Sequence, residues 1–201
     1  MPIDTQTPSS EWKVKIPLIV CSFTIQDQES RPLYNVKSSL NVYTKQKFYD
    51  PETKQLLGSA KAKSTNFAAS KGYSIICNPQ NEVLCVLIAE SYHPCACYVL
   101  PSPVPKANFS FEDFTAGKDE CTHLRVIIEG KWVKLLDNEA GCIVQLRKTK
   151  KNHLHPYYIA QTFPNSFFPQ VISDIIGMGI IALDSKLEEV VIVPIVVPAV
   201  V

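Results

Sequence analysis

Glycine and net charge are both scarce in this chain, and each shortage excludes a class of protein. Seven glycines in 201 residues form no Gly-rich loop of the kind that cradles phosphates, and no nucleophile elbow or paired-carboxylate motif is present. The formal net charge is only +1, so no overall field attracts nucleic acid, and we expect no nucleic-acid partner. The sequence therefore favours a non-enzymatic protein without a cofactor.

A long apolar run and a secretory signal are also missing. The longest uninterrupted apolar part of the helix-length stretch near the carboxyl end, Ile175 to Leu183, falls well short of the roughly 20 residues that cross a bilayer. The first residues are polar, and the seven cysteines are scattered, several of them inside apolar runs, as Cys85 is. We expect reduced thiols in a cytoplasmic protein that is at most peripheral to a membrane.

What the chain does have is a helix-length segment, residues 169–189, whose middle is apolar on every side. Such a helix must be surrounded by protein or lipid. Asp174 and Asp184 bound the apolar part, and Asn165 or Ser166 is a suitable N-cap ahead of Pro169. We predict a helix enclosed by the strands that precede it.

Four stretches share one pattern: a strand, an Asp or Asn, a short turn, and a second strand. They are residues 21–36, 45–60, 73–88 and 131–146. Asp and Asn side chains start turns by bonding their own backbone, and the flanking residues are β-branched and aromatic. Further short strands are expected at residues 13–20, 40–43, 123–128, 155–160 and, limited to an edge by its prolines, 190–198. About a dozen strands exceed one flat sheet, so a closed barrel or sandwich is expected.

Residues 91–120 break this rhythm because prolines are dense there. We predict a long connecting loop over this range with one short strand at 96–100. Phe109, Phe111 and Phe114 are expected to fold back over a barrel end, or to form an exposed patch that binds another protein. Residues 1–11 are predicted to be a disordered tail, and 12–201 a single domain.

Two parts of the chain resemble the tubby-like superfamily, in its LURP-one-related and phospholipid-scramblase-like branch. One is the paired pattern made by Phe23–Asp27 with Leu33–Lys37 and by Phe48–Asp50 with Leu57–Lys61; the other is Ser173–Asp184. The resemblance implies a mainly β fold: a closed, roughly twelve-stranded antiparallel barrel enclosing a hydrophobic C-terminal helix. It also implies a non-enzymatic binding or scaffold module, since tubby domains bind phosphoinositide headgroups and scramblases act at membranes.

The best candidate for anionic lipid is the basic turn formed by Arg147, Lys148, Lys150 and Lys151. Clustered cations attract anionic membranes by roughly 1 kcal/mol per charge near the surface. Lys61 and Lys63 would complete a phosphate pocket if strand pairing brought them near this turn. The alternative is a solvated charged turn without a ligand.

Two other hypotheses belong to different classes. Cys95, Cys97, Cys121 and His123 could hold zinc, although the C-x-C spacing differs from common zinc ribbons and buried free thiols are the simpler interpretation. His153 and His155, beside two tyrosines, could serve acid–base chemistry, but opening a strand is the simpler role.

The apolar tail Val190–Val201 supports a third hypothesis, in which residues 175–201 enter a bilayer as in scramblases. The same tail could instead mediate dimerisation. The sequence leaves the oligomeric state open.

Overall fold

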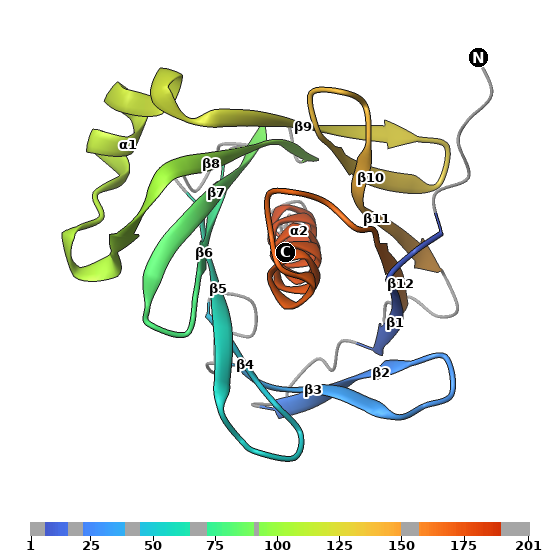
Figure 1. The fold of residues 1–201 in the computed structure, drawn as a ribbon. Coiled ribbons are helices and arrows are strands. Elements are labelled where there is room, and N and C mark those ends of the chain that lie inside the picture. Colours follow the sequence, from blue (N-terminus) through green and yellow to red (C-terminus); the bar gives the residue numbers. More distant parts are fainter. Residues whose placement is uncertain are drawn as a thin grey trace, which may run out of the picture.

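The computed structural model describes residues 7–15, 22–38, 45–64, 72–90, 93–149 and 157–189, which form a mainly β fold around one long helix (Figure 1). The strands are β1 (Ser10–Lys15), β2 (Ser22–Asp27), β3 (Pro32–Ser38), β4 (Gln46–Tyr49), β5 (Leu56–Ser64), β6 (Gly72–Cys77), β7 (Glu82–Glu90), β8 (His93–Pro105), β9 (Thr122–Glu129), β10 (Trp132–Leu136), β11 (Cys142–Thr149) and β12 (Tyr157–Thr162). The helices are α1 (Phe111–Gly117), flanked by short 3₁₀ turns η1 (Lys106–Asn108) and η2 (Lys118–Glu120), and α2 (Gln170–Glu189).

The described strands form a closed antiparallel barrel. From β2 to β12 each strand pairs with its neighbour in sequence, and β1 pairs with both β2 and β12. Trp12 lies opposite Asp27 on one side and Ala160 on the other, which closes the cylinder. The predicted twelve-stranded barrel is confirmed, and so are its four hairpins, β2–β3, β4–β5, β6–β7 and β10–β11.

The turns of the four hairpins have the same geometry. The carboxylate or amide oxygen of Asp27, Asp50, Asn78 or Asp137 accepts backbone N–H groups from the turn residues, at distances of 2.7 to 2.9 Å. A non-glycine residue with positive φ follows in each turn, at Ser30, Lys54, Asn81 and Ala140. Each pair of strands then shifts register near the turn, as a β-bulge does. The Asx turns inferred from the sequence therefore have a common geometry.

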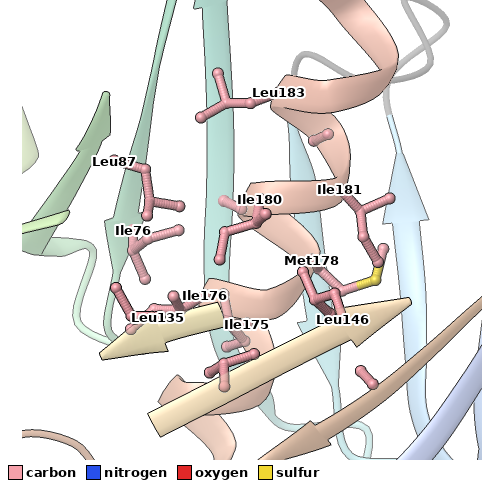
Figure 2. Close-up of a cluster of buried hydrophobic side chains, with 14 of the residues drawn as sticks. Ile76, Leu87, Leu135, Leu146, Ile175, Ile176, Met178, Ile180, Ile181 and Leu183 are labelled. Atoms are coloured by element: carbon pink, nitrogen blue, oxygen red, sulfur yellow. The ribbon is translucent and has the colours of Figure 1, made fainter. Parts of the chain in front are cut away.

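Helix α2 runs along the barrel axis, as Figure 1 shows in a view down the helix. Its isoleucines, Met178 and Leu183 are at most 3% exposed and pack against inward side chains of the wall, including Ile76, Leu87, Leu135 and Leu146 (Figure 2). The enclosed helix predicted from its all-round apolar character is confirmed. Gly179 permits close packing, because a Cβ there would lie 2.9 Å from the Cδ1 atoms of Ile76 and Leu87.

The proline-rich segment differs from the prediction. Residues 93–105 form the 13-residue strand β8 instead of a loop with one short strand at 96–100. Val99 pairs with Cys85 and Val104 with Val83, so the residues between them, including Pro101 and Pro103, bulge opposite Leu84. A bulge needs no ladder hydrogen bond from these prolines, which is why the strand tolerates them.

Residues 111–117 form helix α1, which the prediction of a loop also missed. Ser110 Oγ caps it by accepting from the N–H of Asp113. α1 lies outside the barrel wall (Figure 1). Phe111 and Phe114 of α1, with Phe109 just before it, pack on the outer face of β6 to β8 and not over a barrel end. Phe111 stacks on Tyr73 with ring centroids 3.9 Å apart, and Phe114 meets Tyr98 edge-on at 5.8 Å.

The remaining predictions concern segments that the structure describes only in part. Residues 10 and 11, assigned to the tail, belong to β1, because the backbone of this segment pairs with β12. Residues 1–6, the predicted strands 40–43 and 190–198, and part of 13–20 lie outside the described residues.

Candidate functional site

The basic turn predicted from the sequence does not form one cationic face in the part that is described. Arg147 and Lys148 are neighbours in β11, so their side chains point to opposite sides of the wall. The Arg147 guanidinium lies 5.2 Å from the Trp132 ring centroid on the outside, whereas Lys148 lies 5.9 Å from the ring of Tyr158, a core residue. Lys150 and Lys151 lie outside the described residues.

Lys61 and Lys63 are also far from this turn. They lie in β5, which is six strands away from β11 around the barrel, so the two strands occupy opposite sides (Figure 1). The single phosphate pocket that was to combine them with Arg147 and Lys148 therefore does not form.

The four predicted zinc ligands do not converge either. Cys97 is fully buried in the barrel core, while His123 stacks on Tyr98 at 4.9 Å on the outer face. The Cys95 thiol donates to the carbonyl of Ile88, and Cys121 packs beside the α1 cluster. Within the described ranges no three His, Cys, Asp or Glu side chains are grouped to hold a metal ion. His153 and His155, the acid–base candidates, are not among the described residues.

The structure instead gathers lysines on the outer face of β3 to β5. Lys37, Lys47 and Lys61 point outward, because the neighbours of each on both sides are buried in the core: Val36 and Ser38, Gln46 and Phe48, and Ala60 and Ala62. Continuing the same alternation places Lys45, directly before β4, and Lys63 outward as well. We call the outward residues Lys37, Lys45, Lys47, Lys61 and Lys63 the lysine face. Lys37 lies directly opposite Lys47 in the β3–β4 pair.

No negative side chain on the described outer face of these strands offsets the charge of the lysines. The described outward side chains of β2 to β5 include hydroxyls, amides, Tyr49 and lysines, but no carboxylate. Partial burial and then repulsion from Lys63, Lys106 and Lys45 lower the pKa of Lys61. An anion placed here would relieve that repulsion.

A groove of about 480 Å³ opens at one side of the lysine face. Its lining residues are Ser22, Phe23, Thr24, Asn35, Val36, Lys37, Tyr49 and Lys54. The Lys37 ammonium lies 5.1 Å from the Tyr49 ring centroid, and the Thr24 hydroxyl donates to the Asn35 side-chain oxygen. Ammonium, hydroxyl and amide groups together match a phosphorylated, hydroxyl-rich group.

Inside the barrel, Asp174 is the centre of a hydrogen-bond network that the sequence did not predict. Asp174 is 1% exposed and accepts hydrogen bonds from Trp12 Nε1 at 2.8 Å, Tyr34 OH at 2.5 Å, Thr162 Oγ1 at 2.9 Å and Gln170 Nε2 at 3.2 Å. Burial raises the pKa of Asp174, and the four donors oppose that rise. Burial and the Asp174 charge likewise raise the pKa of Tyr34. The network fastens α2 to β1, β3 and β12.

The segment before α2 also departs from the prediction. Asn165 Oδ1 accepts from the N–H groups of Phe167 and Phe168, while the first helical bonds go to the Pro169 carbonyl. Asn165 therefore shapes the turn that leads into the helix and does not cap the helix itself.

Comparison with known proteins adds little to this geometry. No protein-family model matches the chain, and no curated protein matches it. A crystal structure of a protein from Arabidopsis thaliana is similar, with a TM-score of 0.47 and 12% identity over 90% of this chain and 94% of that one. A TM-score and an identity this low carry no argument, so the fold rests on the strand pairing described above.

None of the described helices combines the length and the apolar character that a bilayer crossing requires. The tail Val190–Val201, on which the membrane-insertion hypothesis depends, is not among the described residues.

Proposed function

We propose that the protein is a non-enzymatic binding module that recognises an anionic phospholipid headgroup at a membrane surface. The lysine face is the observation that carries this proposal: five lysines gather on neighbouring strands whose described outward side chains include no carboxylate. The resemblance of Phe23–Asp27, its partner segments and Ser173–Asp184 to the tubby-like superfamily supports the same ligand class.

The location differs from the one expected from sequence. The cations of the basic turn that are described are divided between two faces, whereas Lys61 and Lys63 remain in the proposed site. The groove beside Lys37 supplies hydroxyl and amide groups that could contact the headgroup itself. Each lysine near an anionic surface contributes roughly 1 kcal/mol of attraction, which suits reversible association.

Vesicle co-sedimentation tests the proposal. We expect the full chain to bind phosphatidylcholine vesicles that contain 5% phosphatidylinositol bisphosphate, with little binding to phosphatidylcholine alone. The double variant Lys61→Glu, Lys63→Glu should bind at least tenfold more weakly. Lys118→Glu with Lys131→Glu is the matched control, since both residues are exposed, lie outside the lysine face, and give the same change in net charge.

A third variant, Lys150→Glu with Lys151→Glu, separates the lysine face from the basic turn. Retained binding in this variant assigns recognition to the lysine face. If the control or the basic-turn variant lost as much affinity as the Lys61 and Lys63 variant, the proposed site would be wrong.

A further inference from the structure

An apolar cavity of about 510 Å³ lies at the end of the barrel where α2 begins. It is lined by Leu57, Asn78, Pro79, Leu84, Val99, Leu100, Pro103, Phe167, Phe168, Pro169, Val171 and Ile172. The β8 bulge forms one wall, because residues 100–103 leave the ladder opposite Leu84. The lead-in to α2 forms the other, where Asn165 fixes the backbone of Phe167 and Phe168.

The chemistry of this cavity restricts its ligand. Asn78 supplies the single polar side chain of the lining, and both of its polar groups are used by Glu82: Oδ1 accepts from the Glu82 N–H at 2.9 Å, and Nδ2 donates to its carboxylate at 2.7 Å. A polar ligand group would lose its water without gaining a side-chain partner. The cavity therefore favours hydrocarbon, and its volume lies within the range of about 300–1,000 Å³ that is typical of small-molecule sites.

The cavity is also preformed. Pro79, Pro103 and Pro169 have fixed φ angles in three separate segments of the wall. Because these walls do not need to be ordered on binding, little of the binding free energy is lost to conformational entropy.

Lys106 lies beside a turn that forms part of the cavity wall. Its backbone N–H donates to the carbonyl of Asn81 at 3.0 Å, in the same turn that supplies Asn78 and Pro79 to the cavity. Its charge also acts on Lys61 and helps to lower the pKa of that residue. An anionic head attached to a chain in this cavity would thus have the cation Lys106 beside the cavity wall.

We propose that this cavity takes one unbranched hydrocarbon chain of an anionic lipid. The anionic headgroup in this statement rests on the proposed function, whereas chain binding rests on the cavity alone.

Binding of cis-parinaric acid, an unbranched polyunsaturated fatty acid that fluoresces in apolar surroundings, tests the chain site. We expect the full chain to bind the probe and palmitate to displace it. Val171→Trp and, independently, Leu84→Trp fill the cavity and should weaken probe binding at least tenfold. Ile128→Trp is the control, since Ile128 is 53% exposed in β9 and does not line the cavity.

The outcomes separate this inference from the proposed function. Absence of probe binding, or equal binding by folded cavity variants and the Ile128→Trp control, overturns the chain site even if vesicles still bind. The chain site is supported if a cavity variant loses probe binding while the Lys61→Glu, Lys63→Glu variant keeps it. This holds even if the unmodified protein does not bind vesicles. A tryptophan variant without a cooperative thermal transition is replaced by the other one, so one folded variant suffices. If apolar peptides displaced the probe but palmitate did not, the site would bind protein and the inference would be wrong.

Discussion

Asp174 shows how much one side chain can organise in this barrel. It is buried, it accepts hydrogen bonds from Trp12, Tyr34 and Thr162 on three strands, and it lies near the start of α2. The sequence indicates an acid near the helix N-terminus, where the macrodipole favours it. The partners could not be inferred, because Trp12 and Asp174 are 162 residues apart and only barrel closure brings them together.

Asp174→Asn should change how stability depends on pH. The folded-state pKa of Asp174 is raised, so between the unfolded value near 3.8 and the folded value the native state holds the proton more tightly. The contribution of Asp174 to stability is therefore greatest at low pH and falls as pH rises through this window. Urea denaturation of both proteins across this range measures the effect. A wild-type advantage over Asp174→Asn that grows with rising pH would contradict the assigned direction.

Gly58→Ala should destabilise the protein strongly. Gly58 has φ +155°, and a Cβ there would lie 2.7 Å from both the Cys77 carbonyl oxygen and Ile175 Cδ1. We expect a loss of at least ~2 kcal/mol in the free energy of unfolding, measured by denaturant titration. Gly117→Ala is the control, because a Cβ at Gly117 meets nothing within 4 Å and its φ is −103°. Equal effects of the two substitutions would show that Gly58 is under no such constraint.

At the scale of elements, the hairpins were the most predictable part of the chain. An Asp or Asn at the end of a strand fixes the turn locally, so sequence patterns identify it without knowledge of the rest of the fold. α1 and the β8 bulge were missed because proline density suggested a loop, whereas α1 is stabilised by distant aromatic partners such as Tyr73. Of the lysine face, alternation alone places Lys61 and Lys63 on the same side of one strand. The pairing of Lys37 with Lys47 could not be inferred, because the sequence predicts a separate strand at 40–43 between their two strands.

Ala140→Gly should stabilise the β10–β11 hairpin. Ala140 has φ +65°, a conformation that costs a residue with a Cβ about 1 kcal/mol and glycine almost nothing. We expect a gain of roughly 0.5–1 kcal/mol in the free energy of unfolding. The same replacement at Ala116, inside α1, should lower stability by about 1 kcal/mol, because glycine is a poor helix former. A loss at both positions would contradict the conformational argument.

Phe114→Ala should loosen α1 from the barrel wall. Phe114 is 8% exposed and contacts three aromatic rings, so its truncation leaves a cavity and should cost about 3 kcal/mol. Amide exchange in residues 111–117 should accelerate more than in α2, since α1 lies outside the closed barrel. Glu112→Ala, an exposed change in the same helix, should alter stability by under ~1 kcal/mol. Uniform acceleration in both helices would show that α1 is not a separate unit.

For the whole molecule, closure was predictable from the strand count and from the enclosed helix, but the sites were not. Which cations share a face depends on the order of strands around the cylinder, and Lys61 and Arg147 are on opposite sides of it. The cavity beside α2 depends on a bulge that sequence patterns did not reveal.

Binding to anionic vesicles should weaken steeply with salt. The lysine face is exposed to solvent for much of its extent, and the Debye length falls from about 10 Å at 0.1 M salt to about 3 Å at 1 M. We expect binding to the bisphosphate-containing vesicles to fall at least tenfold between 50 and 500 mM NaCl, measured by co-sedimentation. Binding of cis-parinaric acid should change little over the same range. Salt-insensitive vesicle binding would contradict recognition through the lysine face.

The seam between β1 and β12 joins Ser10 to Thr162, in the first and the last of the described strands. During synthesis the hairpins can form one after another, yet the cylinder cannot shut until its last strand leaves the ribosome. Because α2 follows that strand, the helix that fills the interior is synthesised after the wall that surrounds it. Until then the inner surface of the wall is exposed, so this late step is the moment at which the nascent protein is most open to aggregation and to help from chaperones.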